Sequence, residues 1–300
     1  MTAEIKCRFA SQIILATILA VASFSSPAQT DIPPEFRIGK VTLNPARQEK
    51  KIAPMAEFLA ARLNYEKAGT VYARNIQDMV KKFQLDEVEY FTGSFWEAAV
   101  LINAGVADPV AVKFKERSEG YRSLIVVRAN SDIQDLTNLR GKLVAFEDPD
   151  STSAFRIPFL RMREAGLDLV ESLDRPDTSD SVHYRFSNAE QISSAWLYRD
   201  IVDAIGISDN DWEKADNVPE FQKNLFRVIY TSEELPRAVD VVRKNISSHH
   251  KLALKEVLLD PSLPLNEPVL LDQYHETSGF SGVDNVTFKL LENFASYYTQ

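Results

Sequence analysis

Three consecutive hydroxyl residues form the part of this sequence best suited to binding chemistry. Ser151, Thr152 and Ser153 come just after residues 143–146, a short apolar run that predicts a buried strand. Helical character follows them and ends at Gly166. Hydroxyls and unpaired backbone N–H groups at a helix start, just past the carboxyl end of a strand, form a cradle for an anion. The alternative is that these hydroxyls only cap the helix.

Motifs for catalysis or metal binding do not accompany this segment. The sequence has no Gly-x-Ser-x-Gly elbow, no glycine-rich Walker loop and no His-Glu-x-x-His pair. Its four histidines lack metal-ligand spacing, and they provide no evident base for a serine nucleophile. We therefore expect no catalytic residue, no metal and no cofactor, and a binding function needs none of these.

Composition restricts the class of partner. With 300 residues, of which 45% are hydrophobic, the chain can bury a sizeable core in one or two domains. A net charge of −9 argues against nucleic acid as a partner, because a reader of the phosphate backbone needs a clustered basic surface. A small anionic ligand is still possible, since neutral dipoles inside a cleft can hold it. We expect the protein to be a monomer.

The amino terminus has the features of a secretory signal peptide. Lys6 and Arg8 precede an apolar stretch at 13–22, and small residues follow it. We expect a cleavable signal peptide over residues 1–28 and a protein exported to the periplasm; the alternative is a retained amino-terminal anchor. The single cysteine, Cys7, lies in this leader, so the processed chain would contain no thiol and no disulfide.

Strand patterns alternate with helix patterns along the rest of the chain. This order predicts an α/β fold with a mostly parallel sheet, and the number of elements suggests two lobes. Strands are expected at 36–42, 70–73, 87–91, 110–114, 123–128, 143–146, 182–186, 201–206, 226–232 and 239–243, and helices at 52–63, 76–83, 95–103, 159–166, 189–199, 247–259 and 285–298.

Three segments around the hydroxyl residues resemble a known family. They are Gly120-Tyr-Arg-Ser123, Asp135-Leu-Thr-Asn-Leu-Arg-Gly-Lys-Leu-Val-Ala-Phe146 and Asp148-Pro-Asp-Ser-Thr-Ser153. They are similar to the pattern of substrate-binding proteins of phosphate, phosphite and phosphonate ABC transporters. In that family the pattern runs Gly-Tyr-x-Ser, Asp-Leu-x-Gly-Lys-x-Val-Ala-Phe, then Asp-Pro-x-Ser-Thr-Ser-Gly.

The resemblance implies the type II periplasmic binding protein fold. Each of its two lobes is a mostly parallel sheet flanked by helices, and two crossover strands join the lobes. On this basis we assign residues 29–125 and 237–300 to lobe 1 and residues 126–236 to lobe 2.

The same resemblance implies a set of ligand contacts. The family places the ligand's oxyanion on the Ser-Thr-Ser segment, although Ala154 stands here where the family has glycine. In lobe 1 the segment with Tyr90, Ser94 and Trp96 matches a strand end whose aromatic residue covers the ligand; core packing is the alternative for Trp96.

Further candidates lie at the cleft wall and in lobe 2. Tyr121 and Ser123 match the Gly-Tyr-x-Ser pattern, with hinge packing as the alternative for Tyr121. The family often has a histidine before a lobe 2 helix, but Glu190 lies in that segment here, which would suit a ligand carrying a cation or a protonated oxygen. The alternative for Glu190 is a helix-start residue that interacts favourably with the helix dipole. Asp203 and Ser208 are expected to end a strand at the same edge.

These expectations combine into one functional prediction. The chain is predicted to be a periplasmic solute-binding protein that captures a small oxyanion, namely a phosphonate, phosphite or phosphate ester, for the membrane permease of an ABC importer. The alternative is a periplasmic sensor of the same fold that signals to a membrane receptor kinase or cyclase. An enzyme is not expected.

Overall fold

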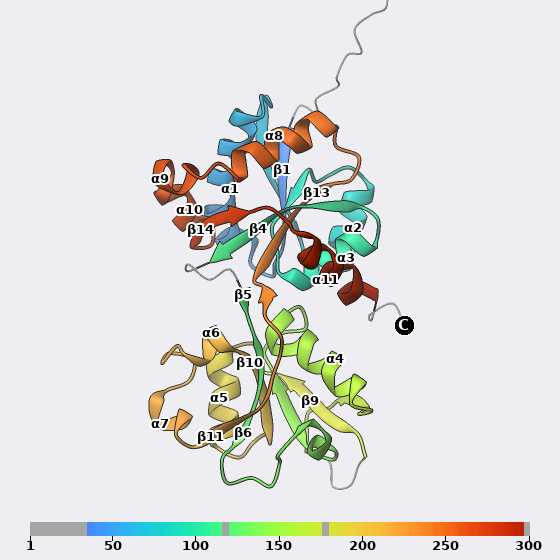
Figure 1. The fold of residues 1–300 in the computed structure, drawn as a ribbon, viewed down its shortest axis with the longest axis vertical. Coiled ribbons are helices and arrows are strands. Elements are labelled where there is room, and N and C mark those ends of the chain that lie inside the picture. The colour runs from blue at the N-terminus through green and yellow to red at the C-terminus, as the bar shows by residue number, and fades with distance from the viewer. Residues whose placement is uncertain (1–34, 116–119, 176–179, 297–300) are drawn as a thin grey trace, which may run out of the picture. The chain divides into compact units, whose positions relative to one another are not determined.

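The structure is a computed structural model that describes residues 35–115, 120–175 and 180–296. The predicted signal peptide, residues 1–28, lies outside the described residues. Two six-stranded sheets, each flanked by helices, form the framework (Figure 1).

The first sheet has the strand order β14-β4-β13-β3-β1-β2. Strand β1 pairs in parallel with β2 and β3, whereas β13, which follows the return crossover, runs antiparallel to β3 and β4. The strands are β1 (Glu35–Val41), β2 (Lys67–Ala73), β3 (Tyr90–Phe91), β4 (Ala107–Lys115), β13 (Ala238–Arg243) and β14 (Thr277–Ser281).

Helices cover both faces of this sheet, and their starts follow from local sequence. Asn44 caps α1 by accepting from the backbone N–H of Arg47, and Pro45 occupies its first turn. Ser94 and Glu97 form a reciprocal capping box at the start of α3. The helices are α1 (Pro45–Arg62), α2 (Ile76–Gln84), α3 (Phe95–Asn103), α8 (Ser248–Leu258), α9 (Leu263–Asn266), α10 (Pro268–Gln273) and α11 (Asn285–Ser296).

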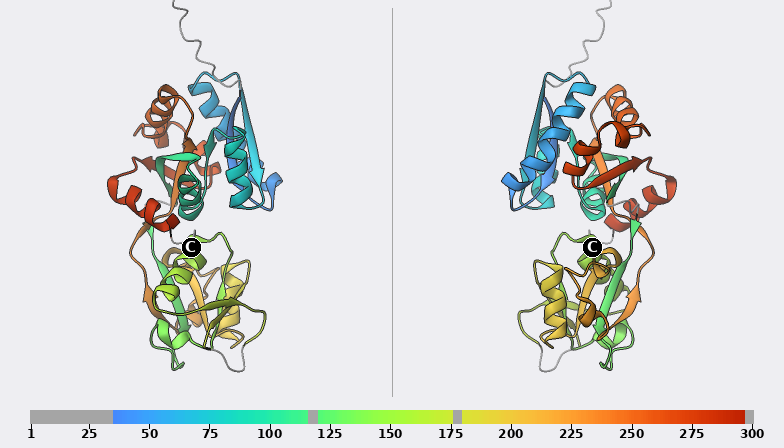
Figure 2. Two further views of the ribbon diagram at one scale, coloured as in Figure 1. Left: turned by 90° about the vertical axis from the view of Figure 1, so that its right-hand side faces the viewer. Right: turned by 90° about the vertical axis from the view of Figure 1, so that its left-hand side faces the viewer.

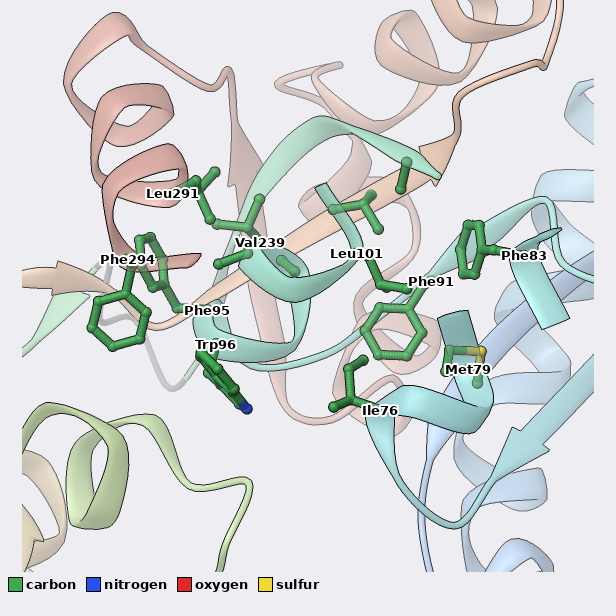
Figure 3. Packing of buried hydrophobic residues seen from close by; sticks show 14 of the residues in the cluster. Ile76, Met79, Phe83, Phe91, Phe95, Trp96, Leu101, Val239, Leu291 and Phe294 are labelled. Atoms are coloured by element: carbon green, nitrogen blue, oxygen red, sulfur yellow. The ribbon is translucent and has the colours of Figure 1, made fainter. Parts of the chain in front are cut away.

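Two hydrophobic clusters enclose the first sheet. One packs α1, α8 and α10 onto one face around residues such as Phe36 and Leu59. The other packs α2, α3 and α11 around Phe91 and Phe95, and Figure 3 shows Trp96 at its margin, near Phe294. Burial of these large side chains supplies the main driving force for this lobe.

The second sheet has the order β11-β6-β10-β7-β9-β8. Strands β10, β7, β9 and β8 are parallel to one another, and β6 runs antiparallel to both of its neighbours. The strands are β6 (Ser123–Arg128), β7 (Leu143–Phe146), β8 (Leu169–Glu171), β9 (Val182–Phe186), β10 (Ala204–Ser208) and β11 (Phe226–Thr231). The helices are the 3₁₀ turn η1 (Leu136–Leu139), the π-type turn η2 (Thr152–Arg156), α4 (Ile157–Glu164), α5 (Glu190–Tyr198), α6 (Asp209–Trp212) and α7 (Glu220–Lys223).

Two short strands connect the sheets. Strand β5 (Gly120–Tyr121) pairs antiparallel with β12 (Leu235–Pro236), so the outward and return connections run side by side (Figure 2). The predicted two-lobed α/β fold with two crossover strands is thus confirmed, with both sheets mixed rather than purely parallel.

Some local predictions need correction. Asp203 does not end a strand, because β10 begins at Ala204 and only Ser208 lies at its carboxyl end. The elements α6, α7, α9, α10, β8 and β14 were not anticipated, because they are too short to show clear periodicity. In the described part of the chain, no helix combines the length and the apolar character needed to cross a bilayer.

A glycine in β10 determines how closely the hydroxyl segment packs against the sheet. A Cβ atom built on Gly206 would lie 2.3 Å from the backbone oxygen of Ala154 and 3.0 Å from the ring of Phe146. We expect Gly206→Ala to lower the free energy of unfolding by roughly 1–3 kcal/mol, as overpacking of a core does. Urea denaturation measures this loss.

The control for this substitution is Gly282→Ala. Its Cβ would first meet Leu259 at 3.9 Å, which is ordinary contact. Equal stability losses in the two variants would contradict a specific close approach at Gly206.

Candidate functional site

A cavity of about 720 Å³ is lined by residues from both lobes. Lobe 1 contributes residues at the carboxyl ends of β1 and β2, including Lys40 and Arg74. Lobe 2 contributes the segment after β7 and Ser208 at the end of β10. The carboxyl edges of parallel strands are where α/β sheets gather ligands, so this cavity is the candidate site.

The hydroxyl residues lie on this cavity in an unusual turn. Ser151, Thr152 and Ser153 all line it. The backbone N–H of Arg156 donates to the carbonyl of Ser151 at 3.0 Å, a bond that spans five residues and defines the π-type turn η2. Such wide turns are frequent at functional sites. Ser151 also caps this turn, since its Oγ accepts from the N–H of Ala154 at 3.2 Å, so capping and cavity lining occur together.

Neighbouring side chains hold the turn in place. The buried Ser123 donates its hydroxyl proton to the carbonyl of Ser153 at 2.6 Å. Ser123 thus fixes the backbone of the hydroxyl segment, and it is not part of the described cavity wall. Tyr121 lines the cavity together with Thr152 and Ser153, and these two hydroxyls act to lower the pKa of its phenol. Burial raises the pKa of Tyr121 to about 12, so its phenol remains a neutral donor.

Thr152 also joins the two lobes. Its Oγ1 accepts from the backbone N–H of Trp96 at 3.1 Å, at the amino end of α3. The Trp96 ring is 3% exposed and packs against Phe294, with the guanidinium of Arg156 at 4.4 Å from its centre. Trp96 does not belong to the described cavity wall, so its position matches the core alternative while its backbone contacts the hydroxyl segment.

The other predicted lobe 1 residues divide between the cavity and the core. Ser94 lines the cavity and caps α3. Tyr90 is fully buried, and its hydroxyl donates to Asp240 at 2.5 Å, inside the lobe and away from the described cavity wall.

The predicted lobe 2 residues divide in the same way. Glu190 and Ser208 line the cavity, and the Ser208 hydroxyl donates to Asp211 at 2.6 Å. Asp203 precedes β10 at the opposite edge of the sheet, where it accepts from the N–H of Leu143 at 2.9 Å and pairs with Arg175 at 3.4 Å. The structure therefore does not bring Asp203 to the cavity.

Carboxyl groups make the lobe 2 wall sensitive to pH. The pKa of Glu147 is raised to about 8, mainly by burial and also by the charges of Glu190 and Asp148, while the Ser151 hydroxyl acts to lower it. Burial, with the charge of Asp211, also raises the pKa of Glu190. A carboxyl that keeps its proton is a hydrogen-bond donor, so the Glu147–Glu190 pair presents less negative charge to the cavity than its composition suggests.

Sequence reasoning missed the cationic part of the wall. Lys40, Arg74, Arg156 and Arg237 line the cavity. No local motif marks these residues, because they come from four separate segments that only the tertiary fold brings together. A cue for Arg237 was its place directly after the return crossover.

The described residues provide no evident metal site. No group of three or more histidine, cysteine, aspartate or glutamate side chains within residues 35–115, 120–175 and 180–296 is arranged to hold a metal ion. The polar groups of the cavity are hydroxyls, amides, carboxyls, guanidinium groups and one ammonium, which suit a small charged organic or inorganic ligand.

Solved structures identify the class of fold. The chain is similar to the protein XAC2383 from Xanthomonas citri, solved with chloride (TM-score 0.79) and with ATP (TM-score 0.78); each match has 22% identity and covers 88% of this chain and 96% of that one. PhnD1 from Prochlorococcus marinus in complex with methylphosphonate matches with TM-score 0.63 and 15% identity, over 89% of this chain and 99% of that one. A binding protein component of an ABC phosphonate transporter from Pseudomonas aeruginosa matches with TM-score 0.59 and 16% identity, over 88% and 87%. The fold is that of the two-lobed type II periplasmic binding proteins.

The family follows from the sequence itself. Residues 41–288 match the family described as "ABC transporter, phosphonate, periplasmic substrate-binding protein", and the chain belongs to this family. Its members are non-catalytic binding proteins, which confirms the expectation of a binding protein rather than an enzyme.

The raised pKa of Glu147 predicts a pH-dependent stability. An acid with a folded-state pKa near 8 and an ordinary value of 4.5 binds its proton more tightly when folded, so its contribution falls as pH rises between these values. We expect Glu147→Gln, which stays neutral, to gain roughly 1–3 kcal/mol relative to the wild type across this window. Urea denaturation over a pH series measures the difference.

A difference between the two proteins that stays constant with pH would contradict the assignment. If Glu147→Gln instead lost stability relative to the wild type as pH rose, the pKa of Glu147 would be lowered rather than raised by folding.

Proposed function

We propose that this protein captures a small oxyanion, namely a phosphonate, phosphite or phosphate ester, in the periplasm and delivers it to the permease of an ABC importer. The proposal rests mainly on one observation: the hydroxyls of Ser151, Thr152 and Ser153 lie on a cavity that both lobes line. Membership of the phosphonate-binding family supports the transporter context.

The hydroxyl segment has the donors that an oxyanion requires. Each hydroxyl oxygen that accepts a backbone N–H still carries its own proton, which it can donate. Ser151 and Thr152 accept in this way, and the neutral phenol of Tyr121 adds another donor beside them. Hydrogen bonds from several neutral donors to an ionised oxygen are stronger than those between neutral groups.

The part of the ligand beyond its oxyanion would contact a wall that contains both acidic and basic side chains. Glu190 and Asp211 line the cavity and favour a ligand that also carries a cation or a protonated oxygen. The volume of about 720 Å³ leaves room beyond an oxyanion head group. Two of the similar structures hold methylphosphonate and ATP, and ATP is itself a phosphate ester.

Ligand binding would change the equilibrium between relative positions of the two lobes. A ligand that contacts both walls stabilises the conformation in which the walls are near each other. We assign residues 29–125 and 237–300 to lobe 1 and residues 126–236 to lobe 2. Export would occur through a cleavable signal peptide at residues 1–28, after which the ligand-bound protein would meet its membrane permease.

Loss of hydroxyl donors tests the proposal. We expect Thr152→Val and Ser153→Ala each to weaken binding of methylphosphonate or phosphate by roughly 1–3 kcal/mol, because each removes a hydrogen bond to a charged group. Isothermal titration calorimetry over a panel of phosphonate, phosphite, phosphate and glycerol phosphate measures the change.

The matched control is Ser172→Ala, a lobe 2 serine whose hydroxyl donates to the carbonyl of Asp174, away from the described cavity wall. Unchanged affinity in both cavity variants, or an equal loss in the control, would refute the assigned role of the hydroxyl segment.

A further inference from the structure

The charge of the cavity wall presents a difficulty for any anion. The described wall carries four cationic and six acidic side chains, so it is net acidic when all are ionised. Hydroxyl donors lower the cost of binding an anion, but they add no positive charge. The acidic residues are Glu97, Glu147, Asp148, Asp150, Glu190 and Asp211.

Two of the four cations are already neutralised. The Nζ atom of Lys40 lies 3.9 Å from the carboxylate of Glu97. The guanidinium of Arg156 lies 3.7 Å from Asp150 and stacks on Trp96. These contacts commit both groups to the protein's own carboxylates and rings.

The other two cations, Arg74 and Arg237, have no ion pair with any carboxylate of the described residues. Arg74 is exposed at the end of β2 in lobe 1. Arg237 is half-buried and follows β12, which pairs with the strand that contains Tyr121. Only Arg237 is therefore anchored beside the hydroxyl segment.

One contact places Arg237 near the hydroxyl segment. Its guanidinium carbon lies 5.8 Å from the centre of the Tyr121 ring. Tyr121 lines the same cavity as Thr152 and Ser153, and both hydroxyls influence the pKa of its phenol. Four groups that can contact an oxyanion, one of them charged, thus line the same cavity.

We propose that Arg237 is the charged contact of the ligand's oxyanion and that it makes the site select doubly charged oxyanions over singly charged ones. This inference rests on the proposed function and names the residue that sets its specificity. A guanidinium matches two oxygens of a phosphonate or phosphate at once. Its Coulomb attraction doubles when the ligand's charge doubles, whereas the neutral donors discriminate less.

The lobe 2 histidine that the family resemblance leads us to expect is absent here. Arg237 would provide the positively charged contact in its place. None of the four histidines, at positions 183, 249, 250 and 275, belongs to the described cavity wall. The cation instead comes from the return crossover, next to the connection between the lobes. Anion binding would therefore act directly on the connecting segment.

Two ligands of similar shape and different charge test this proposal. Methylphosphonate, at a pH where it is fully ionised, carries two charges, and methanesulfonate carries one. We expect the wild type to prefer methylphosphonate, and Arg237→Gln to weaken methylphosphonate binding roughly 10- to 100-fold while changing methanesulfonate binding much less. Arg237→Lys, which keeps the charge but loses the fork, should fall between them.

Arg74→Gln is the matched control, because it removes a second unpaired cation from the same wall. Its effect should be smaller and should decline as salt is added, since an exposed charge acts at long range through solvent. Thermal unfolding of each variant checks that the fold is retained.

The outcomes separate this inference from the proposed function. If the wild type binds none of phosphate, phosphite, glycerol phosphate, methylphosphonate and methanesulfonate, both proposals fail. If the wild type binds and Arg237→Gln binds equally well, or loses both anions to the same extent, the role of Arg237 fails alone. An equal loss in Arg74→Gln would assign the effect to general charge and also refute it.

Discussion

The structure depends on a tight contact between the hydroxyl segment and the strand behind it. Gly206 lets β10 approach the carbonyl of Ala154, and Ser123 binds the carbonyl of Ser153. With these backbone groups fixed from behind, the chain widens into the π-type turn of residues 152–156. Residues 151–153, at the start of this turn, all line the cavity.

The same segment is also where the lobes meet. Thr152 accepts a hydrogen bond from the amino end of α3, and Arg156 stacks on Trp96. A helix amino terminus has unpaired N–H groups that favour a negative partner. In this structure a hydroxyl oxygen satisfies one of them, so contact between the lobes and the anion site depend on the same few residues. A ligand that alters the hydroxyls would alter the lobe contact as well.

Raised pKa values and ion pairs reduce the negative charge that the acidic residues place around the candidate anion site. Burial raises the pKa of Glu147 and of Glu190, and Glu97 and Asp150 are paired with Lys40 and Arg156. Asp148 and Asp211 remain on the wall, together with the hydroxyl donors and the half-buried guanidinium of Arg237, which has no ion pair among the described residues. Charge in this cavity is therefore controlled by protonation and pairing rather than by the net charge of the chain.

The sequence by itself determined the alternation of strands and helices, the two lobes and the hydroxyl segment at a strand end. These features arise from periodicity and from neighbours in the chain, which a linear pattern records. Tertiary structure alone decided that Tyr90, Trp96 and Asp203 lie off the cavity wall while Arg74, Arg156 and Arg237 lie on it. The reason is physical: the cavity is built from strand ends and connections far apart in sequence, and a side chain's exposure to it depends on packing across the fold. The strand predicted at 201–206 lies at Ala204–Ser208 in the structure, so Asp203 precedes it at the opposite edge of the sheet, and no local pattern fixes a strand boundary that closely.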